Sequence, residues 1–80
     1  MEYSVMLDVI DEPGFEGCYY AHIPALELTT HGKGIDGALA AAKELAEVWI
    51  AEKRARGESV PRESGSVIAR IEISDAVLGS

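Results

Sequence analysis

The side chains best suited to bind a metal or attack a substrate are one cysteine and two histidines. His22 and His31 fall on different predicted strands, and Cys18 lies four residues before His22. A zinc site needs three or four ligands at suitable spacing, and the sequence offers no such cluster. Four residues along a strand span about 13 Å, so His22 is too far from Cys18 to activate it as a nucleophile. We therefore predict no metal site, no catalytic residue and no cofactor.

Clustered carboxylates could support a second chemistry, the Mg²⁺-dependent cleavage of nucleic acid. The candidates are Asp8 together with Asp11, Glu12 or Glu44. Two-metal phosphoryl chemistry needs several acids that converge at one edge of a sheet. Only Asp8 lies within a predicted strand, because Asp11 and Glu12 belong to a turn. A Mg²⁺-dependent nuclease stays as an alternative, and the prediction is that the chain is not an enzyme.

Two further features look like sites for anions but have simpler explanations. Gly32-Lys33-Gly34 precedes a predicted helix, whose first N–H groups could hold a phosphate. The remaining residues of the known phosphate-binding loops are missing, so a turn and a glycine N-cap explain both glycines. Residues 53–56 form a basic stretch at the other end of that helix, where positive charge complements the helix dipole. We expect no direct binding of nucleic acid at either place.

The charge of the chain points to a protein partner. Its 80 residues include 7 basic and 14 acidic side chains, for a net charge of −7. Residues 1–34 hold six acids against one base, Lys33. This balance disfavours phosphate contacts and favours attraction of a basic protein to the N-terminal half. We predict that Asp11, Glu12 and Glu16 bind such a partner.

Three short stretches near the N-terminus have the patterns of strands. Residues 2–10 alternate, with Tyr3, Val5, Leu7 and Val9 on one side. A turn at residues 11–14 leads into a second alternating stretch, residues 17–23, and Pro24 ends it. Residues 26–31 are predicted to form a third strand. Short connections between consecutive strands predict a three-stranded antiparallel meander.

The pattern changes at Ile35, from which apolar side chains recur at spacings of three and four residues. They are Ile35, Ala38, Leu39, Ala42, Leu45, Ala46 and Trp49. Alanine and leucine are strong helix formers, and Gly57 is well suited to follow a helix C-terminus. The prediction is one helix of about 22 residues, roughly 33 Å long.

After a linker rich in serine, residues 67–73 alternate again and predict a fourth strand. A right-handed crossover would place it beside the first strand and parallel to it. The predicted fold is therefore α+β, in the order β-β-β-α-β, with the long helix packed on one face of the sheet.

One helix covers only one face of a sheet, so the other face needs a partner. We expect Met6, Ile10, Cys18, Tyr20 and His22 on that second face. A chain of this size without disulfide or metal has a thin core. We therefore predict a homodimer or higher oligomer that uses these residues. No apolar run approaches the 20 or so residues of a membrane span, and the single cysteine favours a cytoplasmic location.

Several short motifs occur in an order that resembles the N-terminal domain of the HicB antitoxin family. After the Pro13-Gly14 turn comes a glycine followed by an aromatic strand that ends in Ile-Pro, at residues 17–24. Gly32 leads into a helix with Ala38-Leu39 near its start and Trp49 near its end, and residues 57–61 read Gly-Glu-Ser-Val-Pro. The sequence departs from the family at residues 25–28, where Asp-Leu-Pro-Gly is usual, and at Gly34 and Gly37, where a capping Thr and Glu are usual.

The resemblance implies a partial RNase H-like fold without a working nuclease site. It further implies a toxin–antitoxin role, in which the chain neutralises a HicA-like toxin, a small basic protein that cleaves mRNA. Many members of the family carry a C-terminal DNA-binding domain, but only seven residues follow Ile73. We thus expect residues 1–80 to form a single HicB-like domain with no separate DNA-binding domain. A stand-alone oligomeric domain with another binding role is the alternative.

Overall fold

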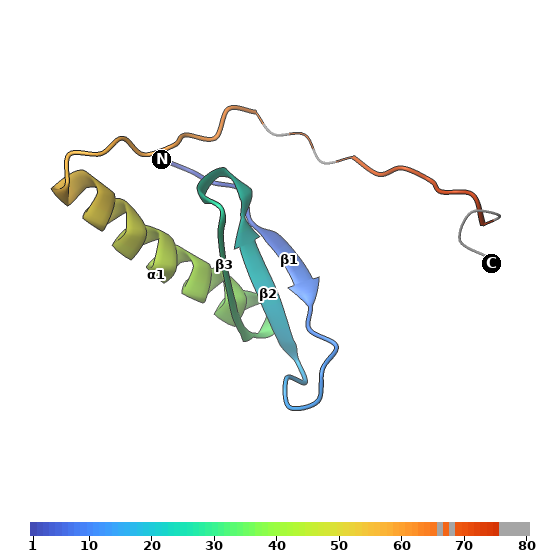
Figure 1. The fold of residues 1–80 in the computed structure, drawn as a ribbon. Coiled ribbons are helices and arrows are strands. Elements are labelled where there is room, and N and C mark those ends of the chain that lie inside the picture. Colours follow the sequence, from blue (N-terminus) through green and yellow to red (C-terminus); the bar gives the residue numbers. More distant parts are fainter. Residues whose placement is uncertain (66, 68, 76–80) are drawn as a thin grey trace.

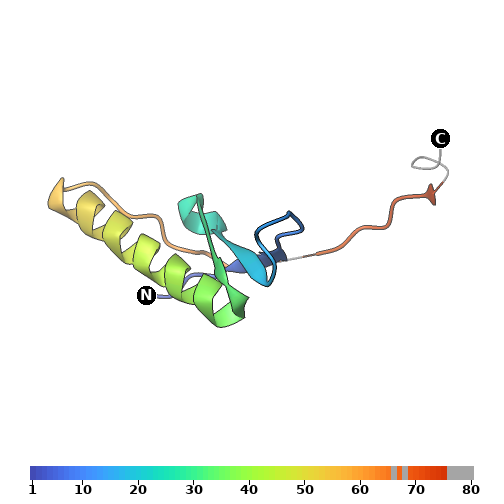
Figure 2. The same cartoon turned by 90° about the horizontal axis from the view of Figure 1, so that it is seen from below.

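Three antiparallel strands followed by one long helix make up the body of the molecule in a computed structural model, which describes residues 1–65, 67 and 69–75 (Figure 1). The strands are β1 (Met6–Val9), β2 (Cys18–Ile23) and β3 (Leu28–Lys33). Their order in the sheet is β1-β2-β3, and both neighbouring pairs are antiparallel. The helix α1 (Gly34–Ala55) lies on one side of the strands (Figure 2). The predicted α+β meander with one helix on one face is confirmed.

The third strand begins two residues later than the sequence predicted. Pro24–Leu26 form a single 3-10 turn, and Glu27 then adopts a left-handed conformation with φ of 54°. Proline fixes φ near the helical value and has no N–H to donate, so it starts this turn instead of allowing the strand to continue. The strand then runs on to Lys33 and includes Gly32, which the sequence analysis had assigned to a break.

Gly32 is required where β3 passes against the start of α1. A Cβ atom added at Gly32 would lie 2.5 Å from the carbonyl carbon and oxygen of Gly37. Such a distance is far inside van der Waals contact, so only glycine allows the strand and helix backbones to approach this closely. Gly32 thus has a steric role, because it lets β3 lie directly against the first turn of α1 at Gly37.

The helix closely matches its predicted length and ends in a well-formed cap. It contains 22 residues, its N-cap residue is Lys33 instead of the expected Gly34, and no side chain caps its N-terminus. At the other end, the N–H of Glu58 donates to the carbonyl of Lys53 and the N–H of Gly57 to that of Arg54. With Gly57 at φ of 70°, this pair of bonds is a Schellman motif, which stops the helix.

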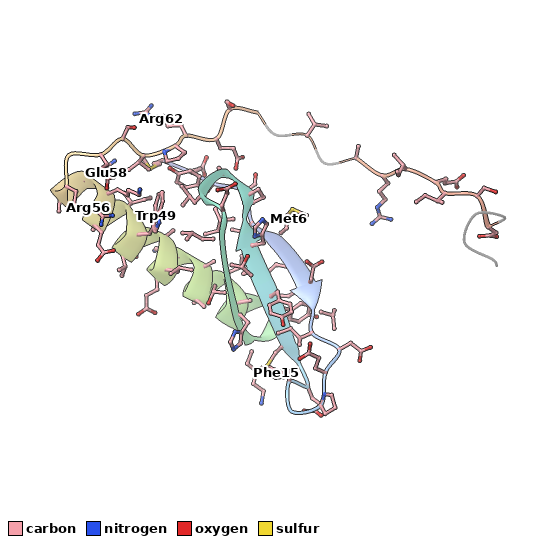
Figure 3. All side chains as sticks on the ribbon, in the orientation of Figure 1. Met6, Phe15, Trp49, Arg56, Glu58 and Arg62 are labelled. Atoms are coloured by element: carbon pink, nitrogen blue, oxygen red, sulfur yellow. The ribbon has the colours of Figure 1, made fainter. Side chains whose placement is uncertain are left out.

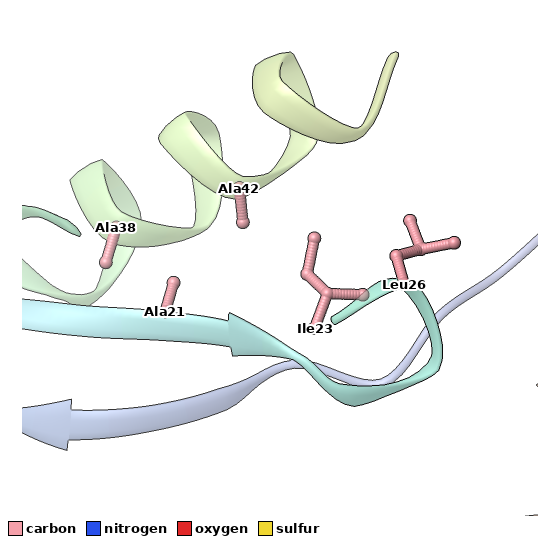
Figure 4. Packing of buried hydrophobic residues seen from close by; sticks show 5 residues of the cluster. All are labelled: Ala21, Ile23, Leu26, Ala38 and Ala42. Atoms are coloured by element: carbon pink, nitrogen blue, oxygen red, sulfur yellow. The ribbon is translucent and has the colours of Figure 1, made fainter. Parts of the chain in front are cut away.

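The core between sheet and helix is small. Its buried residues are Ala21, Ile23, Leu26, Ala38 and Ala42 (Figure 4). Alanine at three of the five positions lets the two layers lie close but removes little apolar surface from water. Partly buried side chains, including Tyr3, Val5, Trp49 and Ile50, surround this cluster. Of the predicted helix stripe, Ile35 and Leu39 remain exposed and Leu45 is half-buried.

The described residues do not show the fourth strand predicted over residues 67–73. Residues 67 and 69–73 pair with no strand of the sheet, and residue 68 lies outside the described part of the chain. After α1 the chain returns along the N-terminal residues and then runs away from the sheet and the helix (Figures 1 and 2). Without that strand, the RNase H-like topology implied by the resemblance to the HicB family is also not shown.

Candidate functional site

The loop between β1 and β2, residues 10–17, is organised by its own backbone hydrogen bonds. The N–H of Phe15 donates to the carbonyl of Glu12 over 3.1 Å, and the N–H of Cys18 donates to the carbonyl of Phe15 over 3.0 Å. The N–H of Ile10 donates to the carbonyl of Cys18 over 3.1 Å and closes the base of the loop. Gly14 and Gly17 both adopt positive φ. Two consecutive turns thus give the acidic residues of this loop defined positions.

The three predicted partner-binding acids, Asp11, Glu12 and Glu16, all lie on this loop and are exposed. Hydrogen bonds from the backbone N–H groups of Glu16 itself and of Gly14 hold the pKa of the Glu16 carboxyl below its ordinary value. The N–H of Gly14 lies 3.3 Å from Oε1 of Glu16. Glu16 therefore helps to shape the loop, whereas Asp11 and Glu12 can present their charges to a partner without that structural role.

The start of α1 joins the loop and adds to the negative charge there. The N–H of Gly34 donates to the carbonyl of Gly17 over 2.7 Å, which fixes the first residue of the helix against the loop. Asp36 lies in the first turn of α1 and is exposed. The nearest base in the sequence is Lys33, at the end of β3. This end of the molecule is therefore predominantly acidic.

The opposite end carries most of the positive charge. Glu58 forms salt bridges with Lys53, at 3.8 Å, and with Arg56, at 2.8 Å. The Lys53 ammonium also lies 5.2 Å from the centre of the Trp49 ring. Trp49, Arg56, Glu58 and Arg62 gather at this end of the helix in Figure 3, far from Phe15 in the loop. Residues 52–63 hold four bases and three acids, so this end of the molecule is nearly neutral, whereas the loop end is acidic.

The sheet face that α1 leaves uncovered holds four of the five residues predicted for an oligomer interface. Met6 pairs with His22 across β1 and β2, and their side chains share this face with those of Cys18 and Tyr20. Met6 and Tyr20 are 40% and 39% exposed, while Cys18 and His22 are half-buried. The fifth, Ile10, is only 5% exposed and offers almost no surface to a second chain.

Two residues that the sequence analysis did not select connect the acidic loop to the uncovered face. The ring of Phe15 meets that of His31 edge to face, with centroids 5.9 Å apart, and Tyr20 meets His31 in the same way at 6.5 Å. Phe15 is the only phenylalanine of the chain and lies in a polar turn, which could have marked it as a contact residue. The aromatic group of Phe15, Tyr20 and His31 therefore extends the candidate surface from the loop onto the sheet.

The other residues considered for chemistry lie apart from one another. Asp8 pairs with Tyr20 on the uncovered face, whereas Glu44 is on α1, which packs against the opposite face. His22 Nδ1 lies 2.7 Å from Thr29 Oγ1, its partner on β3. Within residues 1–65, 67 and 69–75, no three Asp, Glu, His or Cys side chains are grouped so that they could hold a metal ion.

Comparison with known proteins gives no guide to the role of the acidic loop and the uncovered sheet face, which are therefore interpreted from their own geometry. No model of a protein family, no curated protein and no solved structure matches the chain. In the part of the chain that the structure describes, no helix combines the length and apolar character needed to cross a membrane.

Proposed function

We propose that this chain is a HicB-like, antitoxin-type protein of the cytoplasm that neutralises a small basic, HicA-like mRNA-cleaving toxin by direct contact. The proposed role is not enzymatic and needs no cofactor or nucleic acid. The toxin would meet the acidic loop and the adjoining part of the uncovered sheet face.

The feature that carries this proposal is the acidic loop at the end of the sheet. Asp11 and Glu12 are exposed on a loop whose backbone is fixed by hydrogen bonds, so their charges are held in place before a partner arrives. Asp36 adds a further charge at the start of α1, beside the loop. Negative charge concentrated at one end attracts a basic protein from a distance and orients it during approach.

Next to these charges, the aromatic group supplies apolar contact area. Phe15 and Tyr20 are 37% and 39% exposed, and both contact the exposed ring of His31. Aromatic side chains are enriched at protein interfaces because they bury a large area at a small cost in conformational entropy. The loop would therefore steer the toxin, and the aromatic group would retain it.

The proposal includes the complete four-stranded, partial RNase H-like fold. Residues 69–73 keep the alternation of a strand, and β1 is an edge strand of the three-stranded sheet. A fourth strand beside β1 would pair its free edge, which otherwise exposes unpaired backbone groups. The proposal also includes a homo-oligomer, since the core within one chain is small.

Measurement of toxin binding tests the proposed function. The probe is the protein encoded by the neighbouring reading frame, which we expect to be small, basic and active in cleaving RNA. Asp11→Lys with Glu12→Lys should lower the association rate about tenfold at low salt and change the dissociation rate little. Glu44→Lys with Glu52→Lys alters the net charge equally but on exposed helix positions, and serves as the matched control.

Three results would contradict the proposal. The first is that the protein encoded by the neighbouring reading frame is neither small nor basic. The second is that it forms no complex with this chain at low salt. The third is that the loop variant and the helix variant slow association equally. RNA cleavage by this chain itself, with Mg²⁺ and lost on Asp8→Asn, would instead support the nuclease alternative.

A further inference from the structure

The described residues beyond Gly65 leave apolar side chains in water. Ile71 is 84% exposed and Ile73 is 54% exposed. Together with Ala69 they alternate with the charged Arg70 and Glu72, so an extended chain would show one apolar side and one charged side. A segment with this pattern needs a sheet edge and an apolar surface to become buried.

The molecule has a surface of that kind along its N-terminal residues. A groove of about 620 Å³ lies between residues 1–5 and α1. Its lining includes Val5, Leu39, Ala46 and Ile50, with Lys43 and Glu47 as its charged helix residues. Leu39 is 40% exposed, because α1 packs over β2 and β3 and leaves this flank open. The groove therefore lacks apolar side chains that would fill it.

The free edge of β1 adjoins this groove, since residues 3 and 5 continue into β1. Among the described residues β1 pairs only with β2. Five extended residues span about 16 Å, so residues 69–73 are as long as Val5 and β1 together. The segment, the strand edge and the groove thus match in length and in apolar character.

The path of the chain determines whose segment fills the groove. Tyr3 Oη donates to the carbonyl of Pro61 over 2.6 Å, and the N–H and hydroxyl of Ser4 each donate to the Glu63 carboxylate over 2.6 Å. These bonds fix the chain as far as Glu63. At Gly65 the backbone takes φ of 77°, and the described residues beyond it run away from their own sheet (Figure 1). The segment therefore points away from the sheet and groove of its own chain.

The exposed surface of one chain is also too large for a complete unit. Its accessible area is 6392 Å². A compact protein of 8.6 kDa is expected to expose about 4,700 Å². Exchange of equal segments between two copies would bury much of this surplus, because each copy gives a strand and receives one.

From these observations we infer that two copies of the chain exchange residues 69–73. Each segment pairs with the free edge of β1 in the other copy and places Ile71 and Ile73 in the groove beside α1. The inference rests on the fourth strand of the fold proposed above and is independent of any toxin.

Two measurements on the full chain test the exchange. By size-exclusion chromatography with light scattering, the native protein should have twice the 8.6 kDa mass of one chain, and Ile71→Asp with Ile73→Asp should halve that mass. Arg70→Ala with Glu72→Ala changes the charged side of the same segment and should leave the dimer intact. In a mixture of ¹³C-labelled and unlabelled native protein, isotope-filtered NOEs should connect Ile71 and Ile73 of one copy with Leu39 of the other.

The possible results separate the exchange from the proposals on which it rests. A monomer whose NOEs join Ile71 and Leu39 within one copy would overturn the exchange and retain the four-stranded fold. A dimer unaffected by the aspartates but broken by Tyr20→Asp would overturn it in favour of the uncovered sheet face. Absence of any NOE between the two residues would overturn both the exchange and the fourth strand. None of these results depends on toxin binding.

Discussion

The close approach of β3 and α1 makes a sharp prediction about two neighbouring glycines. In Gly32→Ala the new methyl group would lie 2.5 Å from backbone atoms of Gly37. Ordinary contacts of this kind exceed about 3.4 Å, so strand and helix would have to separate by about 1 Å. Overpacking of this sort costs about 1–3 kcal/mol, and the upper part of that range applies because backbone atoms cannot rotate away.

The same substitution at the facing glycine, Gly37→Ala, is the matched control. A Cβ at Gly37 meets its nearest atom, the carbonyl carbon of Gly32, at 3.7 Å, which is normal contact. Replacing a helical glycine with alanine lowers the entropy of the unfolded chain and gains about 0.5–1 kcal/mol. Gly32→Ala should therefore lower the free energy of unfolding and Gly37→Ala should raise it, so that the two variants differ by about 2–4 kcal/mol.

Urea unfolding at one fixed protein concentration, followed by far-ultraviolet circular dichroism, measures this difference. With an m-value of about 1 kcal/mol/M for a chain of this size, the midpoints of the two variants should lie about 2–4 M apart. Fixed concentration matters because any association of the chain would stabilise it by mass action. If Gly32→Ala unfolds at the native midpoint, the contact between β3 and α1 described above is wrong.

Two further predictions concern the core and the bonds that fix the C-terminal segment. Leu26→Ala should cost about 2–5 kcal/mol, because Leu26 is buried in the 3-10 turn, whereas half-buried Leu45→Ala should cost clearly less in the same unfolding measurement. Hydrogen bonds from the hydroxyl and then the N–H of Ser4 hold the pKa of Glu63 below its ordinary value, so Ser4→Ala should raise that pKa in an NMR titration. Because the folded-state pKa of Glu63 is lowered, its contribution to stability is present above the unfolded-state pKa and is lost as pH falls through the folded value; Glu63→Gln should lack this loss.

The helix and the faces of the strands could be predicted from the sequence because they follow from local periodicity. Alanine and leucine at spacings of three and four fixed α1 to within about one residue, and Gly57 marked its end. The third strand was predicted as well, although β3 begins at Leu28, two residues later than expected. The boundary was wrong because Pro24 starts a 3-10 turn, which preserves the burial of Leu26 while displacing the strand.

Features that depend on contacts between distant parts of the chain were harder to predict from the sequence. The acidic loop was predicted from the Pro13-Gly14 turn, and its residues do lie together. The contact of Phe15 with His31 was missed, because alternation along one strand does not reveal what a loop packs against. The burial of Ile10 was missed for the same reason. Alternation likewise predicted a strand at residues 67–73. It does not specify which edge of the sheet that strand would join, or whether the sheet belongs to the same chain or to a second copy.

The difference in charge between the acidic loop and the nearly neutral C-terminus of α1 gives each molecule a permanent dipole along its length. Two copies that lie side by side are attracted when they run antiparallel, since each loop then faces the other copy's arginines, and repelled when they run parallel. Added salt weakens both effects once the charges are separated by more than the screening length of about 10 Å. Because each copy carries a net charge of −7, the mutual repulsion of two copies slows their association in dilute buffer, and added salt weakens that repulsion. The dipole therefore orients two approaching copies, with antiparallel pairs favoured over parallel ones, and does not itself drive their assembly.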